Sequence, residues 1–310
     1  MLNKYIPRIG LGMFIVITTL FFYSTLNAET KKQANEEFRQ KLESVITEEK
    51  EEELPQELDS YIRYIPSRGV NALSGKVAIM AASSEYSYAL KAFGKLPVEF
   101  SLDTQYIGIE NTTGVELPAH LMGLSCGIET TLPFFKFNQT YLRIGVSPSF
   151  YGDDWSFPAS SFRIPLRSFL IYQPNDKWTY ILGAAVYPDF ETKVWPILGF
   201  IYKPNDKLTF NIVPERPNIS YSFNERVTLF LEGGSSYDEF EVDKDNLKNV
   251  VLRYKEIHLG TGIKYKFNKF IQTSISAGGI FNRSLRYRES LGKVDIKDSV
   301  YTEFRVEINL

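Results

Sequence analysis

The sequence predicts an all-β fold, a transmembrane antiparallel up-and-down β-barrel of about 12–14 strands. Apolar and polar residues alternate with a period of two in successive stretches after residue 60, and no stretch there has convincing helical spacing. The alternating stretches are about 9–11 residues long, the length that a tilted membrane-spanning strand requires. Aromatic residues gather beside the tight turns, where a barrel carries its interfacial girdles.

The N-terminus has the layout of a secretory signal peptide over residues 1–28. Lys4 and Arg8 form a positive region, residues 9–23 are almost wholly apolar, and Ala28 supplies the small residue at the cleavage point. The apolar run is shorter than the ~20 residues of a spanning helix, which favours cleavage over an uncleaved anchor. We therefore expect export, with the bacterial outer membrane as the destination.

Residues 29–59 are predicted to be an acidic, flexible periplasmic extension. The run of acidic residues at 48–53 and Pro55 favour this interpretation over a short amphipathic helix, which is the alternative. The remainder of the chain is near neutral, which argues against a nucleic-acid partner. Cys126 is the only cysteine and there are two histidines, so neither an intrachain disulfide nor a zinc cluster is expected.

The barrel is predicted over residues 60–310, and its last strand illustrates the alternation. Thr302, Phe304 and Val306 point one way, whereas Glu303 and Arg305 point the other. A soluble β-sandwich would also alternate, with its apolar face in the core. Strand length, and the alternation of tight turns with longer polar loops, favour the membrane barrel.

An internal repeat locates the tight turns. Residues 171–180 and 201–210 share an Ile-Tyr-x-Pro-Asn-Asp-Lys pattern, and Pro-Asn-Asp is strong turn chemistry. Weaker versions occur at 223–226 and 267–270. With these turns in the periplasm, outer loops are expected near residues 110–118, 152–160, 188–193, 237–249 and 282–298. Both chain ends then lie in the periplasm, which requires an even strand number. Thirteen strands can be drawn from Ser74, so a strand at Tyr61–Pro66 would give fourteen and merging short strands would give twelve.

A family resemblance is carried by turn and strand residues. The stretch Val194-Trp195-Pro196-Ile197-Leu198-Gly199-Phe200-Ile201-Tyr202-Lys203-Pro204-Asn205-Asp206-Lys207 leads through Pro214 and Arg216-Pro217 to Ile219-Ser220-Tyr221, with Arg253–Gly262 and Phe281-Asn282-Arg283 downstream. Together these resemble an uncharacterised bacterial family of outer-membrane β-barrels catalogued as a domain of unknown function. The resemblance covers about residues 60–310 and implies fold and location. It implies no activity.

One residue departs from the usual pattern of such barrels. They end in an aromatic residue that the assembly machinery reads, and this chain ends in Leu310. The expected partners are outer-membrane lipid, the barrel assembly machinery during biogenesis, and small solutes.

Alternation also predicts which charged residues line the lumen. These are Arg143, Arg163, Arg167, Glu232, Glu256, His258, Lys264, Glu303, Arg305 and Glu307, together with Glu99, Asp103 and Lys255. They could form a charged constriction that selects solutes. Alternatively, the acids and bases could pair across the lumen and hold the barrel in shape. The mixed signs argue against strong anion or cation selectivity.

The leading functional hypothesis is a passive pore or transporter for small solutes. A non-conducting structural or surface-interaction barrel is the alternative, because twelve to fourteen strands lie between the ~8 of filled barrels and the ~16–18 of open porins. A barrel lipid hydrolase or protease is a weaker hypothesis. His120 would lie at an outer rim, but no motif places a serine beside either histidine, so no catalytic residue is predicted. No cofactor or metal is expected, and the acidic stretch 237–249 is interpreted as a solvated loop rather than a calcium site.

Overall fold

The computed structural model of the chain describes residues 56–92, 96–134, 139–155, 158–188, 190–244, 247–288 and 291–310. The predicted signal peptide lies outside the described residues, as does the predicted acidic extension up to residue 55. Residues 56–310 form one compact unit, and the description below concerns that unit alone.

The described unit consists almost entirely of β-strands. The elements are β1 (Gln56–Gly69), β2 (Lys76–Ala92), β3 (Leu96–Asn111), β4 (His120–Pro133), β5 (Thr140–Val146), β6 (Ser149–Gly152), the 3-10 helix η2 (Ala159–Ser161), β7 (Phe162–Arg163), β8 (Leu166–Asn175), β9 (Trp178–Val186), β10 (Val194–Asn205), β11 (Leu208–Ile212), β12 (Asn218–Ser222), β13 (Val227–Lys244), β14 (Leu247–Lys266), β15 (Ile271–Tyr287), β16 (Lys293–Ile296) and β17 (Ser299–Asn309). In the described ranges, no helix is long and apolar enough to cross a membrane.

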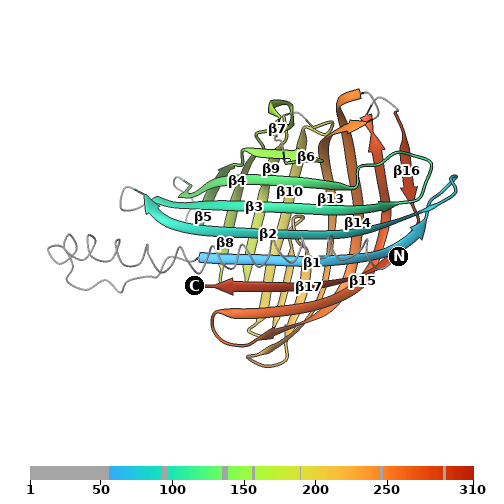
Figure 1. The fold of residues 1–310 in the computed structure, drawn as a ribbon. Helices are drawn as coiled ribbons and strands as arrows, with labels where there is room; N and C mark the ends of the chain where they lie inside the picture. Colours follow the sequence, from blue (N-terminus) through green and yellow to red (C-terminus); the bar gives the residue numbers. More distant parts are fainter. Residues whose placement is uncertain are drawn as a thin grey trace, which may run out of the picture. The chain divides into compact units, whose positions relative to one another are not determined.

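These strands close into a fourteen-stranded antiparallel barrel (Figure 1). Three barrel strands are each interrupted once, so that β5 continues into β6, β7 into β8 and β16 into β17 in the same register. Closure comes from β1, which pairs antiparallel with both β2 and β17. The predicted fold class and the number fourteen are therefore confirmed. The strand expected at Tyr61–Pro66 is β1, which begins at Gln56, inside the range assigned to the extension.

The predicted tight turns lie where the Pro-Asn-Asp repeat placed them, between β8 and β9 and between β10 and β11. In each turn the asparagine side chain holds the backbone. The Oδ1 of Asn205 accepts hydrogen bonds from the N–H groups of Lys207 and Leu208, each at 3.0 Å. Asn175 binds the corresponding groups at 3.0 and 3.1 Å. Asn224 and Asn268 do the same in the other two hairpins, so one local interaction explains all four turns.

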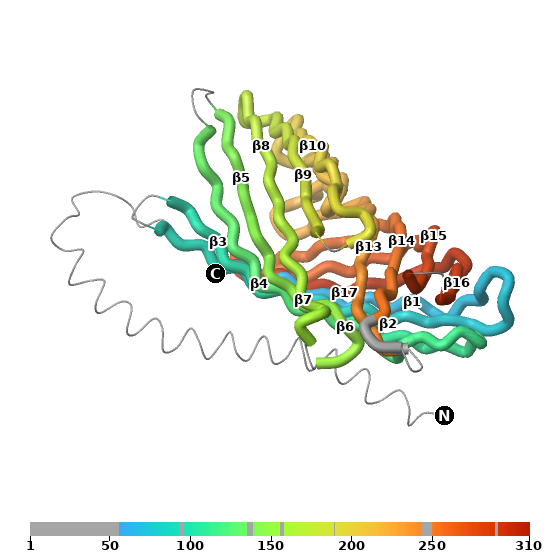
Figure 2. Tube along the Cα trace, turned by 90° about the horizontal axis from the view of Figure 1, so that it is seen from above, coloured from blue at the N-terminus to red at the C-terminus, as the bar shows by residue number. Residues whose placement is uncertain are grey.

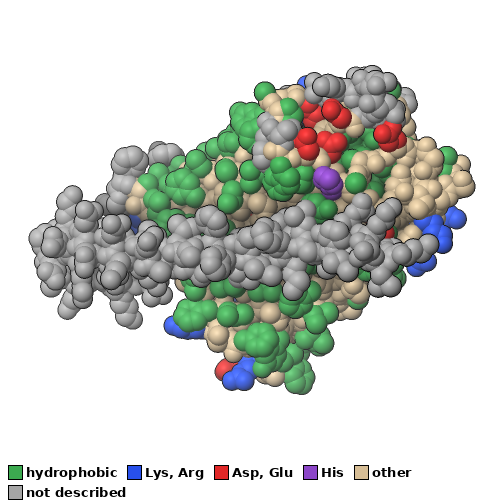
Figure 3. Space-filling view, in the orientation of Figure 1, with side chains coloured by type: hydrophobic (Ala, Val, Ile, Leu, Met, Phe, Trp, Pro, Cys, Tyr) green, Lys and Arg blue, Asp and Glu red, His purple; other side chains and the backbone are tan. Residues whose placement is uncertain are grey.

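The two faces of the wall differ as the alternation predicted. Outward side chains are apolar and strongly exposed, including Ile275 at 65%, Leu198 at 72% and Phe304 at 47%. Their neighbours Glu303 and Arg305 point inward and are buried. Figure 3 shows apolar side chains spread over much of the visible described surface. An apolar exterior around a polar interior is the pattern of a membrane barrel and the reverse of a soluble one.

At the end of the barrel away from the two termini, the interior is filled rather than open. The outer halves of β1–β4 face those of β13–β16 and form a buried apolar cluster of Ile65, Val70, Val77, Ile79, Ile107, Ile109, Leu121, Phe240, Val242, Leu252, Tyr254, Ile280, Leu285, Tyr287, Val294, Ile296 and Tyr301. We call this set the outer core. A single bridge between Gly152 and Glu241 also joins β6 to β13 across this end. Figure 2 shows β5, β8, β9 and β10 standing away from the layer that contains β1–β4 and β17.

Two of the predicted loops are wrong, because their residues form strands that contribute to the outer core. Residues 237–249 were expected to be a solvated loop, but β13 continues to Lys244 and β14 starts at Leu247. Residues 282–298 contain the end of β15 and all of β16. At Asn282, whose φ is +51°, the inward face of β15 changes from even-numbered residues, such as Ile280, to odd-numbered ones. Arg283, Leu285 and Tyr287 are therefore buried. Burial of these inward residues stabilises strand pairing where the acidic composition suggested a loop.

Candidate lumen site

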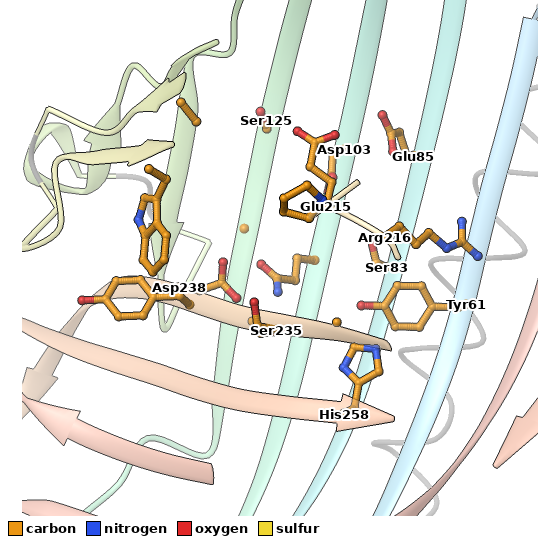
Figure 4. A pocket seen from close by; sticks show the side chains of 18 of the residues that line it. Tyr61, Ser83, Glu85, Asp103, Ser125, Glu215, Arg216, Ser235, Asp238 and His258 are labelled. Atoms are coloured by element: carbon orange, nitrogen blue, oxygen red, sulfur yellow. The ribbon is translucent and has the colours of Figure 1, made fainter. Parts of the chain in front are cut away.

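A polar cavity of about 640 Å³ lies inside the barrel below the outer core. Strands β1–β4 line one side, and β9, β10, β13 and β14 line the other. Figure 4 shows Ser83, Glu85 and Asp103 from the first group, with Asp238 and His258 from the second. The volume falls in the range of ~300–1,000 Å³ that small-molecule sites occupy.

The β11–β12 loop, residues 213–217, turns into this cavity. Pro214, Glu215 and Arg216 all line it. Glu215 forms an ion pair with Arg167 of β8 at 3.5 Å, and Arg216 forms one with Asp59 of β1 at 3.0 Å. The loop therefore connects two charged clusters on different parts of the wall.

The first cluster lies on β3, β4, β5 and β8. Arg143 binds Glu99 at 2.9 Å and Glu129 at 2.6 Å. Arg167 also forms an ion pair with Glu129, at 3.4 Å, and a second one with Glu215. Each arginine contacts two carboxylates, which compensates for its withdrawal from water.

The second cluster lies on β1, β14 and β17. Arg63, whose side chain is 7% exposed, binds Glu303 at 2.7 Å and Glu256 at 3.0 Å. Arg305 binds the other oxygen of Glu303 at 2.9 Å and Asp59 at 2.7 Å. The strand alternation brings these side chains to the same inner face, because Arg63 and Glu303 are register partners across β1 and β17.

Further polar contacts continue the second cluster along the inner wall. Lys264 binds Glu307 at 2.8 Å near the end that carries the termini. The ring of His258 lies 3.4 Å from the Arg63 guanidinium. Glu232 accepts a hydrogen bond from Ser276 at 2.7 Å. Most of the charged side chains on the inner face therefore form an ion pair or a hydrogen bond.

Several inner carboxylates take no part in these ion pairs. Among those that line the cavity are Glu85, Asp103 and Asp238, of which Asp238 is hydrogen-bonded to Gln105. Figure 4 shows Glu85 and Asp103 side by side on neighbouring strands. We call these three residues the acidic trio. An unpaired group of one sign in a confined space gives a negative potential that attracts cations.

The structure brings most of the predicted lumen residues together. The predicted residues that face the barrel interior are Arg143, Arg167, Glu232, Glu256, His258, Lys264, Glu303, Arg305, Glu307, Glu99 and Asp103. Arg163 lies apart on β7, 3.7 Å from Glu241 near the outer end. Lys255 lies on the other face of β14, because it alternates with the buried Tyr254 and Glu256. The predicted rim residue His120 begins β4, where its ring stacks on Tyr106 at 6.1 Å.

The sequence analysis missed several lumen residues. Asp59 was assigned to the extension, although it shares the inner face of β1 with Tyr61 and Arg63. Asp238 was assigned to a loop. Glu215 and Arg216 were not predicted to enter the lumen, and no periodic pattern in a loop could have indicated it.

The amino-acid sequence matches a known family. A model of the family "Domain of unknown function (DUF6268)" matches residues 98–306. The chain belongs to the DUF6268 family. This confirms the predicted resemblance to a barrel family without an assigned activity. The DUF6268 match contains β4–β16 whole and most of β3 and β17, whereas Asp59, Arg63 and Glu85 precede it.

Several solved barrels share the general architecture of this DUF6268 protein at low similarity. The KdgM porin is 10% identical, with 81% of this chain and 99% of that chain covered and a TM-score of 0.33. The COG4313 outer membrane channel from Pseudomonas putida F1 is 10% identical, with 86% and 100% covered and a TM-score of 0.46. A Pseudomonas aeruginosa FadL homologue is 11% identical, with 83% and 89% covered and a TM-score of 0.45. No curated protein matches the chain. These likenesses are too distant to assign a function, so the proposal below depends on the chain's own geometry.

Proposed function

We propose that this DUF6268 protein is a bacterial outer-membrane channel or transporter that passes small solutes through a selective chamber. The observation that supports this most directly is the polar cavity of about 640 Å³ enclosed by a barrel with an apolar exterior. A cavity of this size holds a solute of a few hundred daltons with part of its hydration.

The lumen is a chamber rather than a wide pore because it is narrowed at two levels. The outer core fills the outer end with packed side chains. Below the outer core, Glu215 and Arg216 link the two charged clusters across the lumen. A solute must pass charged groups at short range, which is how charged constrictions select what they transmit.

The chamber favours cations or polar molecules that carry a positive charge. The arginines of the two clusters are each bound to carboxylates, so their charge is compensated locally. The acidic trio forms no ion pair among the described residues. This differs from the sequence-based expectation of little selectivity, which counted charges without knowing which were paired.

The non-conducting barrel remains the second candidate, and the outer core supports it. Its inward side chains, such as Phe240 and Leu252, are fully buried and form a plug without a separate domain. In that case the paired charges would serve only to hold the barrel in shape.

Single-channel recording separates the two candidates. The refolded protein would be inserted into a planar bilayer, and the reversal potential would be measured in a salt gradient. Stepwise cation-selective currents are expected, and Asp206→Asn in an exposed periplasmic turn should leave them unchanged. Correctly folded and inserted barrels that give no current would refute the channel and favour the structural barrel.

A further inference from the structure

The barrel wall is incomplete beside the β11–β12 hairpin. β11 and β12 have five residues each, whereas β10 has twelve and β13 has eighteen. β10 pairs with β11 only from Phe200 onward, and β12 pairs with β13 only as far as Glu232. Beyond these points, residues 194–199 of β10 and 234–240 of β13 have a described strand neighbour only on their other sides, β9 and β14.

The backbone of β10 is suited to a free edge at this point. The carbonyl of Lys193 accepts a hydrogen bond from the N–H of Tyr187, and the N–H of Lys203 donates one to the carbonyl of Lys177, each at 2.8 Å. The backbone groups of odd-numbered residues therefore point toward β9. Because backbone groups alternate between the two sides of an antiparallel strand, Pro196 faces the opening. Proline has no N–H group to leave unpaired, and it occurs in sheets mainly at such edges.

The lumen cavity reaches this opening. A cavity confined to the inner face of a strand touches alternate residues, as it does on β1, where it touches Asp59, Tyr61 and Arg63. On β13 it touches seven consecutive residues, 232–238, and on β10 it touches 195–197; on β4, which is paired on both sides, it touches three, 123–125. The long run on β13 brings the cavity to the unpaired edge of that strand.

Side chains define the outer border of the opening. The ring of Trp195 lies 5.2 Å from that of Tyr237, whose hydroxyl is 3.2 Å from the Thr192 hydroxyl. Above these rings, Glu239 binds Arg253 at 3.0 Å. The opposite border is the backbone bond from Gly233 to Pro217. The opening thus spans about six residues of β13, or about 20 Å along the strand.

The surface beside the opening is apolar. Leu198 on β10 is 72% exposed, and Leu259 and Ile257 on β14, the register partners of Gly233 and Ser235, are 52% and 41% exposed. These outward side chains belong to the lipid-facing face of the wall. Free strand edges at this depth are costly in hydrocarbon unless water or a ligand reaches them, and the polar cavity supplies that access.

We propose that the opening between β10 and β13 is a lateral portal that connects the lumen chamber with the bilayer. Its substrates are small amphiphiles with an apolar body and a cationic group. The apolar body passes Leu198 and Trp195, and the cationic group meets the acidic trio inside. This inference depends on the proposed passage of small solutes and specifies their route and class.

The test uses Trp195 as a reporter in the full chain. The chain has three tryptophans, so the double variant Trp155→Phe/Trp178→Phe leaves Trp195 alone. In proteoliposomes its fluorescence should be quenched both by lipids brominated on their acyl chains and by aqueous acrylamide. Quenching by only one of the two would overturn the portal, because it would place Trp195 either in lipid alone or in water alone.

Matched controls use the intact part of the wall. Leu182→Trp in the background without native tryptophans puts a reporter outside on β9, at the register partner of Leu198, and should respond to brominated lipid only. Ser125→Trp puts one inside on β4 and should respond to acrylamide only. If the single-tryptophan proteins fail to fold, a spin label on Ser235→Cys in a Cys126→Ser background replaces them, with oxygen and a water-soluble nickel complex as the two relaxants.

The solute class is tested in the same preparation. Dodecyltrimethylammonium below its micelle-forming concentration should reduce lipid quenching of Trp195 more than dodecyl sulfate does, and equal effects would overturn the cationic preference. The outcome is separable from the channel proposal. Double quenching without conductance would mean a portal into a closed chamber, whereas conductance with quenching by acrylamide alone would mean a channel without a portal.

Discussion

Glu215 and Arg216 are adjacent in the chain, yet they bind opposite charged clusters of the lumen. Glu215 lies 3.5 Å from Arg167 on β8, and Arg216 lies 3.0 Å from Asp59 on β1. The five-residue loop 213–217, which contains Pro214 and Pro217, thereby connects walls that the strand order keeps apart. This loop is the element that narrows the chamber.

Neutralising the loop should widen the conducting path. In Glu215→Gln/Arg216→Gln the ion pairs of the loop with Arg167, Asp59 and Glu307 are lost while side-chain size is nearly kept, so the loop is held less firmly across the lumen. We expect the single-channel conductance to rise roughly twofold or more, because the constriction limits the current. Half-exposed ion pairs contribute only ~0–1 kcal/mol each, so the free energy of unfolding should change little. An unchanged conductance with normal folding would show that the loop is not the constriction.

Neutralising two members of the acidic trio, Asp103 and Asp238, should reduce cation selectivity. Asp103→Asn/Asp238→Asn removes two carboxylates that form no ion pair from the cavity wall without changing its volume. The reversal potential in a salt gradient should shift toward zero, since the negative potential that concentrates cations is lost. Asp206→Asn, which removes an equal charge from an exposed turn, serves as the control. A selectivity that stays the same in the double variant would exclude Asp103 and Asp238 as its source.

Removing Arg63 should destabilise the barrel strongly. Arg63→Met leaves the buried Glu256 without its arginine and removes one of the two partners of Glu303, and breaking a buried ion pair costs about 3–5 kcal/mol. Adding Glu256→Gln should recover part of this loss, because the stranded carboxylate becomes neutral. Lys293→Met, which breaks an exposed pair with Asp295 at 2.9 Å, should cost less than ~1 kcal/mol.

Urea titration in detergent micelles, followed by heat-modifiable electrophoretic mobility, measures these differences in the free energy of unfolding. If Arg63→Met were no more harmful than Lys293→Met, the second cluster would have no structural role.

The alternation predicted the wall well because lipid and lumen impose opposite demands on successive residues. Phe304 faces outward and Glu303 inward for the reason that the sequence pattern indicated. The turns were equally predictable, because Asn205 and its three counterparts act through local hydrogen bonds. Such features depend on residues within a few positions of each other.

Features that depend on distant partners were not predictable. Composition assigned Asp59 to the acidic extension, although its partners Arg216 and Arg305 lie far along the chain. Acidic residues around Asp238 suggested a loop, whereas burial of Phe240 against the outer core keeps this segment in β13. The identity of an ion pair cannot be read from alternation, which gives only the face on which each charge lies.

The turn asparagines should contribute measurably to stability. Asn205→Ala removes two side-chain hydrogen bonds to backbone N–H groups, each worth about 0.5–1.5 kcal/mol. We expect the free energy of unfolding to fall by about 1–2 kcal/mol because these groups are partly hydrated when released. Asp206→Ala in the same turn should have little effect, since its side chain makes no corresponding bond among the described contacts. Equal losses in both variants would mean that turn hydration, not the asparagine, determines the effect.

Truncating Phe240 should both destabilise and open the outer end. Phe240 is fully buried and its ring meets that of Tyr151 edge-on at 5.9 Å, so it closes the outer core above the chamber. Phe240→Ala leaves a cavity and should lower the free energy of unfolding by about 3–5 kcal/mol. It should also raise the single-channel conductance, because the space it vacates adjoins the cavity through Tyr151. Phe304→Ala, which removes an outward, lipid-facing ring, should leave the conductance unchanged. Destabilisation without any gain in current would mean that solutes do not pass the outer core, leaving the opening between β10 and β13 as the route out of the chamber.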